Sequence, residues 1–112
     1  MNDSQSMSIS QEDLAIVADI LLRHVPHYAV LAYGSRTRKD AKPYSDLDLA
    51  IVADRPLTLA EMAAIKEDFS ESDLPWKVDI VDWSTTGPEF QKIIKQEKVV
   101  LQDGEAFHSL IA

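Results

Sequence analysis

Apolar residues follow two spacings along this chain, and each spacing predicts a different kind of element. In three segments they recur three or four positions apart, on one face of a helix, and in four others they form short dense runs typical of buried strands. The expected helices cover about residues 10–24 and 58–70, with a third that begins near residue 86. The expected strands are residues 28–33, 46–53 and 76–82, with a short final strand at 99–101.

The predicted helix starts carry capping signals, and the order of elements predicts the sheet. Ser10 with Asp13 resembles a capping box, Thr58 with Glu61 forms a full one, and Pro88 suits a first helical turn. The second and third strands flank a helix, so they should be parallel. The first strand is antiparallel to the second only if the connection of about a dozen residues is an elaborated loop. We expect an α/β (α+β) fold, a small mixed sheet with helices packed mainly on one face.

Length and composition describe one small domain. The 112 residues are 46% apolar, which is enough for a single core. We expect a disordered N-terminus at residues 1–9, the domain at 10–104 and a tail at 105–112. The chain has no cysteine, no apolar run near the ~20 residues that cross a bilayer, and no signal-peptide pattern at its start. We therefore expect a cytoplasmic protein without membrane contact.

The charge balance argues against a nucleic-acid partner. The net charge is -8, whereas proteins that bind nucleic acid directly usually present a basic face. The connection between the first two strands nevertheless gathers four cations, Arg36, Arg38, Lys39 and Lys42. Local positive charge in an acidic protein suits a small anionic ligand better than a polymer.

Two aspartates at the start of the second strand are the strongest candidates for chemistry. Asp46 and Asp48 are two positions apart, so on a strand their side chains share a face, with Cα atoms about 7 Å apart. Two uncompensated carboxylates this close repel each other, and a divalent cation removes the conflict. Oxygen ligands suit Mg²⁺ or Mn²⁺ better than zinc. The alternative is that both are ordinary turn-end aspartates.

The third strand supplies two further aspartates. Asp79 lies between Val78 and Ile80, where an unpaired charge would be costly to bury, so we prefer it as a third metal-facing carboxylate. The alternative for Asp79 is an edge position open to water. Asp82 lies three positions further along, faces the other way, and is expected to be either a solvated strand end or a turn residue that precedes a helix.

A Gly-Ser pair precedes the basic connection and predicts a phosphate cradle. Gly34 allows close backbone approach to a ligand, Ser35 offers a hydroxyl, and the amides of a following turn can point at phosphate oxygens. We favour Arg38 for a triphosphate, with Arg36 as the second candidate. The alternatives are that Gly34 and Ser35 only cap a short helix and that both arginines are solvated.

These residues resemble the nucleotidyltransferase superfamily that includes DNA polymerase beta. Its signature is Gly-Ser, a spacer, Asp-x-Asp and a third carboxylate on a later strand, which Gly34-Ser35, Asp46-Leu47-Asp48 and Asp79 match. The stretches Gly34-Ser-Arg-Thr-Arg and Ser45-Asp-Leu-Asp-Leu are similar to those of the minimal nucleotidyltransferase (MNT) domain proteins of prokaryotes, and the likeness covers roughly residues 10–104.

The resemblance implies a nucleotidyltransferase that moves AMP from ATP to a hydroxyl. Asp46, Asp48 and Asp79 would be catalytic and hold two Mg²⁺ ions, with Mn²⁺ as a substitute. It also implies a partner, a helical HEPN ribonuclease toxin, which such antitoxins neutralise by adding AMP to a tyrosine in a hetero-oligomer. Two alternatives stay open: a small hydroxyl acceptor such as an aminoglycoside, and an antitoxin that acts by binding alone.

Overall fold

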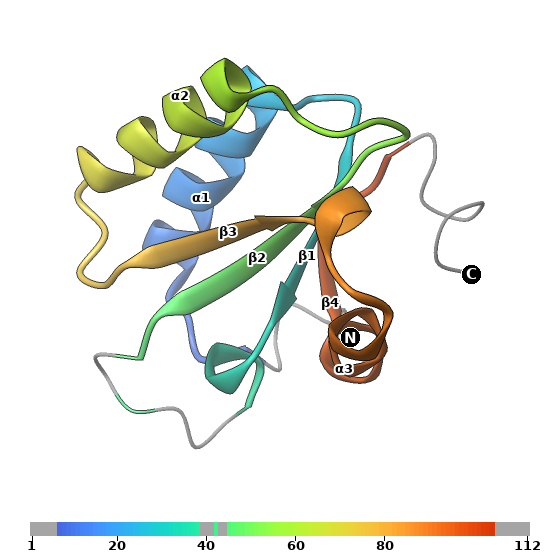
Figure 1. The fold of residues 1–112 in the computed structure, drawn as a ribbon. Helices are drawn as coiled ribbons and strands as arrows, with labels where there is room; N and C mark the ends of the chain where they lie inside the picture. Colours follow the sequence, from blue (N-terminus) through green and yellow to red (C-terminus); the bar gives the residue numbers. More distant parts are fainter. Residues whose placement is uncertain (1–6, 39–41, 43–44, 105–112) are drawn as a thin grey trace.

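A four-stranded mixed sheet forms the centre of the computed structural model, which describes residues 7–38, 42 and 45–104 (Figure 1). The strands are β1 (Ala29–Tyr33), β2 (Leu47–Val52), β3 (Val78–Asp82) and β4 (Val99–Gln102), in the spatial order β3-β2-β1-β4. The helices are α1 (Gln11–His24), α2 (Leu59–Ser70) and α3 (Pro88–Glu97), with short 3-10 turns η2 (Ser35–Thr37) and η3 (Trp83–Thr85). The predicted α/β class is confirmed.

Local capping explains where the first two helices begin. The Ser10 hydroxyl accepts a hydrogen bond from the Asp13 amide at 3.1 Å. Thr58 and Glu61 form a reciprocal capping box, because the Glu61 amide donates to the Thr58 hydroxyl and the Thr58 amide donates to the Glu61 carboxylate. Both predicted starts are confirmed, since each cap satisfies amides that the helix leaves unpaired.

The helices cover both faces of the sheet. α1 and α2 pack together over one face, and α3 lies on the other (Figure 1). All five residues of β1 are buried, as expected for a strand covered on both sides. The prediction of helices mainly on one face holds for α1 and α2, and α3 creates a second, smaller core around Leu31, Ala50 and Ile94.

The strand directions resolve the alternative left open for β1. β2 and β3 are parallel, as predicted, and β1 is antiparallel to both β2 and β4. The connection from β1 to β2 is therefore the elaborated loop, and it begins with η2. Its antiparallel course brings the end of β1 next to the start of β2, so the Gly-Ser pair and the Asp-x-Asp pair meet.

Arg36 ties this loop to the rest of the domain. Its side chain is 5% exposed and donates to the carbonyls of Ser45 and Ser8, at 2.7 Å and 2.5 Å. The guanidinium also lies 4.4 Å from the ring centroid of Trp76 in a cation–π contact. Ser8, expected ahead of the domain, contacts η2 because its amide donates to the Arg36 carbonyl, and Met7 and Ile9 pack on the core under α1 and α2.

The two ends of the chain, expected to be a disordered N-terminus and a tail, lie partly outside the described residues. Residues 1–6, the tail at 105–112 and Lys39 of the basic cluster lie outside the described residues. Within the described part of the chain, no helix has the length and apolar character needed to span a membrane.

Asp82 takes the second of its two expected roles, since it is the turn residue that caps the start of η3 and is not a solvated strand end. It is 7% exposed, and its carboxylate accepts hydrogen bonds from the Leu57 amide at 2.7 Å and from the amide and hydroxyl of Ser84. These contacts fix the loop before α2 and the start of η3. The Leu57 amide and the amide and hydroxyl of Ser84 therefore replace water as the partners of this carboxylate.

Replacing Asp82 should therefore destabilise the fold. Asp82→Ala leaves the Leu57 and Ser84 amides without their acceptor, and we expect the free energy of unfolding to fall by about 2–3 kcal/mol. Asp82→Asn keeps one acceptor oxygen and should lose less. Urea denaturation of both variants measures the difference, and equal stability of wild type and Asp82→Ala would contradict this structural role.

Candidate active site

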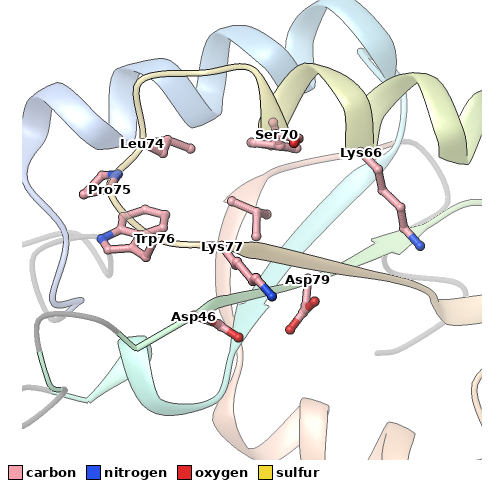
Figure 2. A pocket seen from close by; sticks show the side chains of 10 residues that line it. Asp46, Lys66, Ser70, Leu74, Pro75, Trp76, Lys77 and Asp79 are labelled. Carbon is pink, nitrogen blue, oxygen red and sulfur yellow. The ribbon is translucent and has the colours of Figure 1, made fainter.

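Three aspartates gather at one end of β2 and β3. In the sheet register Asp48 of β2 pairs with Tyr33 of β1 on one side and with Asp79 of β3 on the other. Residues paired directly across neighbouring strands point to the same face, so Asp48 and Asp79 stand side by side. Asp46 precedes Asp48 by two positions, and Figure 2 shows Asp46 and Asp79 on the same side of β3, where both line one pocket.

The carboxylates of this site lie close enough to repel one another. Burial raises the pKa of Asp48 to about 6, and the negative charges of Asp79, Asp46 and Glu97 add to that rise. Burial together with Asp48, Asp79 and Glu97 also raises the pKa of the Tyr33 hydroxyl to about 12. The site is thus a concentration of negative charge, which a bound cation would relieve.

Asp79 lies at this site, but in an environment that differs from the buried one expected. Its side chain is exposed on the edge strand β3, so no buried charge has to be compensated there. The edge position considered as the alternative is the observed one. The register with Asp48 nevertheless places Asp79 beside the other carboxylates, so an open edge position and a metal-facing position are compatible.

The donor set fits a hard cation that shares its ligands with a substrate. All three side chains offer carboxylate oxygens, the ligands that Mg²⁺ prefers. Among the described residues, no three acidic, histidine or cysteine side chains are grouped closely enough to hold an ion by themselves. Mg²⁺ usually binds through one or two carboxylates plus substrate phosphates, not in an all-protein cage, so this open arrangement suits it.

Gly34 makes the close approach of the turn possible. Its φ of 82° lies in the region that favours glycine, and a Cβ there would be 2.4 Å from Oδ2 of Asp48. Any larger residue would therefore strain the turn and push against Asp48. The predicted need for glycine is explained by contact with a carboxylate of the site.

Glu97, which the sequence analysis did not single out, completes the surroundings of this turn. It is the last residue of α3, and its Oε1 accepts a hydrogen bond from the Gly34 amide at 3.0 Å. Its Oε2 lies 3.6 Å from Nη1 of Arg38. A single acidic residue at a helix end gives no signal in the sequence, because only the return of α3 across the sheet brings it here.

The two arginines of the turn have different surroundings. The Arg38 side chain is 56% exposed beside Glu97, where an anion can reach it. Arg36 is buried against backbone carbonyls and Trp76, which indicates a structural role and argues against the predicted phosphate contact. Ser35 is half-buried at the start of η2, close to Gly34 and Asp48 along the turn.

A small mixed sheet with a Gly-Ser turn against aligned carboxylates defines the nucleotidyltransferase class of enzyme. The family model described as "Polymerase beta, Nucleotidyltransferase" matches residues 16–106, and the chain belongs to this family. The resemblance drawn from Gly34-Ser35 and Asp46-Leu47-Asp48 is confirmed.

Individual relatives extend this result. The chain is 50% identical over 105 residues to the probable protein adenylyltransferase MntA of Haemophilus influenzae, covering 94% of this chain and 92% of that protein. It is similar to a crystal structure of a toxin-antitoxin with AMP-PNP, with a TM-score of 0.73 and 19% identity over 88% of this chain and 80% of that chain. A tri-AMPylated Shewanella oneidensis HEPN toxin in complex with MNT antitoxin matches with a TM-score of 0.67 and 19% identity, covering 90% of this chain and 77% of that chain. At these identities the two structures show the fold alone.

The raised pKa of Asp48 predicts that the site weakens the fold. An acid whose pKa is higher in the folded state destabilises the protein once it ionises, so the penalty is absent below pH 4, grows between pH 4 and 6, and is complete above pH 6. Without added metal, Asp48→Asn should therefore raise the free energy of unfolding at pH 7.5 by about 1–2 kcal/mol.

Urea denaturation in EDTA at pH 7.5 and pH 4 measures this gain. The exposed Asp54→Asn variant is the matched control, because it removes a charge of the same sign away from the site. A gain of equal size at both pH values, or in both variants, would contradict the assignment of the penalty to Asp48.

Proposed function

We propose that this protein is an antitoxin that uses magnesium to transfer AMP from ATP to a hydroxyl, a tyrosine by preference, on a HEPN toxin. The observation that carries the proposal is the alignment of Asp48 with Asp79 beside the Gly34 turn. The homology to a probable protein adenylyltransferase supports AMP as the transferred group and a protein as the acceptor. A cytoplasmic location, where ATP is abundant, belongs to this proposal.

The turn after β1 is suited to bind the triphosphate. The Gly34 amide, the Ser35 hydroxyl and the Arg38 guanidinium lie around the site as hydrogen-bond donors to phosphate oxygens. Glu97 holds two of these groups in the structure, so the triphosphate would compete with its carboxylate for them. The AMP-PNP in the similar toxin-antitoxin structure supports a nucleotide as a ligand of this protein.

The proposed transfer is an in-line displacement at the α-phosphorus. The acceptor oxygen forms a bond to phosphorus, the bond to the pyrophosphate oxygen breaks, and the hydroxyl proton leaves to water. Two Mg²⁺ ions, or Mn²⁺ in their place, would be held by Asp46, Asp48 and Asp79, and when bound they would neutralise phosphate charge and ease removal of the proton. The chain's own residues then position the donor, which is most of what such a transfer requires.

The HEPN toxin is the proposed partner in a hetero-oligomer. The similar Shewanella oneidensis MNT antitoxin is in complex with a tri-AMPylated HEPN toxin, which supports both the partner and the modification. The net charge of -8 suits a partner that presents basic residues, although the region of Arg38 remains locally positive.

Neutralising one carboxylate should abolish AMP transfer. Asp48→Asn keeps the shape of the side chain but removes a charged metal ligand, and we expect the transfer of label from α-³²P-ATP to the toxin to fall about 100-fold or more. Asp54→Asn should label the toxin like the wild type. Undiminished labelling by folded Asp48→Asn would reject the site.

A growth assay separates catalysis from binding. If neutralisation depends on AMP transfer, the triple variant Asp46→Asn, Asp48→Asn, Asp79→Asn should bind the co-expressed toxin but fail to restore growth. Full protection by this variant would show that the antitoxin acts by contact alone. Intact-mass measurement of the co-purified toxin, which gains one AMP mass per addition, records the modification independently.

A further inference from the structure

The segment that leads into α1 passes beside η2 and contacts the turn proposed to bind phosphate (Figure 1). Met7 and Ile9 pack on the core under α1 and α2, so this part of the chain is anchored in the domain. Ser8 lies between these two apolar residues and makes the contacts with the turn. The turn is therefore held from outside by a residue that has no part in the proposed transfer.

Three hydrogen bonds join Ser8 to this turn. The Ser8 amide donates to the Arg36 carbonyl at 2.9 Å, and Nη1 of Arg36 donates to the Ser8 carbonyl at 2.5 Å. The Ser8 hydroxyl donates to the Arg38 carbonyl at 2.7 Å. Every polar group of Ser8 is thus used on the turn, and three bonds from different atoms fix its orientation more closely than one bond could.

The hydroxyl contact bears on Arg38, the arginine proposed to bind the triphosphate. η2 ends at Thr37, and Arg38 itself is extended, with φ of -107° and ψ of 148°. The hydrogen bond that closes η2 uses the Arg38 amide, so its carbonyl depends on the contact with Ser8. At the other end of the residue, Nη1 lies 3.6 Å from Oε2 of Glu97. Arg38 is therefore held through both its backbone and its guanidinium.

Ordering a long side chain opposes the binding of a ligand, and a backbone that is already fixed reduces this cost. We propose that Ser8 is a positioning residue for nucleotide binding, whose hydrogen bond to the Arg38 carbonyl orients this arginine for the triphosphate. Ser8 acts through Arg38 and not by contact with phosphate. This inference rests on the proposed transfer of AMP from ATP, and it adds a residue that lies outside the Gly-Ser and Asp-x-Asp signature.

Removing the Ser8 hydroxyl tests this role. Ser8→Ala keeps both backbone contacts with Arg36 and loses the contact with Arg38. We expect the calorimetric Kd for ATP with Mg²⁺, and KM for ATP in transfer to the HEPN toxin, to rise about 3–10-fold, the effect of one lost hydrogen bond. The kcat should stay within about twofold of wild type, because the reacting groups are unchanged. Ser8→Thr keeps a hydroxyl and should restore the Kd to within about twofold.

A serine two positions further along provides the matched control. The Ser10 hydroxyl caps α1 by accepting a hydrogen bond from the Asp13 amide. Ser10→Ala removes the same chemical group from the same segment, so it should lower the free energy of unfolding without changing the Kd for ATP.

A double-mutant cycle tests the route through Arg38. Arg38→Gln alone should weaken ATP binding, and adding Ser8→Ala should change the Kd by less than about twofold more, because the arginine that Ser8 positions is gone. An unchanged Kd in Ser8→Ala, an equal rise in Ser10→Ala, or a full additive effect in the Arg38→Gln background would each overturn the positioning role while wild-type transfer stands. Absence of ATP binding and AMP transfer in the wild type would instead reject the proposed function, and the role of Ser8 with it.

Discussion

Repulsion among carboxylates that the sheet register holds together is the constraint on which this site depends. Asp48 lies between Tyr33 and Asp79 in the register, and burial and neighbouring charges raise its pKa to about 6. An apolar residue at this half-buried position would avoid the free-energy cost of a partly desolvated charge. The rest of the domain must be stable enough to hold the aspartates in place. A bound cation with its nucleotide would offset part of the free energy that their repulsion costs.

The second core and the Arg36 contacts supply that rigidity close to the site. α3 packs against β1 through Ile94, and the same helix ends at Glu97, which accepts a hydrogen bond from the Gly34 amide. On the other side of the turn, Arg36 connects Ser45 to Trp76, so the loop before the Asp-x-Asp pair is anchored to the segment before β3. The Gly-Ser turn, the carboxylates and the segment before β3 are thereby parts of one connected structure.

Features that depend on local sequence were predicted well, and those that depend on tertiary approach were not. Helix caps and the parallel β2–β3 pair follow from short patterns, and Asp46 with Asp48 follows from the strand period. Asp79 lies beside Asp48 in the register, but the reason given for choosing it, an unpaired buried charge, was wrong, and its role as a metal ligand stays a prediction. Glu97 was missed because its partners Gly34 and Arg38 lie far from it in the sequence, and the burial of Arg36 depends on distant Ser8, Ser45 and Trp76. A buried arginine and a solvated one look alike in a sequence.

The arrangement also explains how so short a chain can select a substrate. On the proposed function, the donor side of the site would use backbone and side-chain groups of one turn, which suit phosphate oxygens and carry little information about the acceptor. Selectivity for the acceptor would then have to come from contacts outside this turn. A folded protein partner can supply many of these contacts itself, whereas a small hydroxyl compound would depend on a pocket that the chain provides.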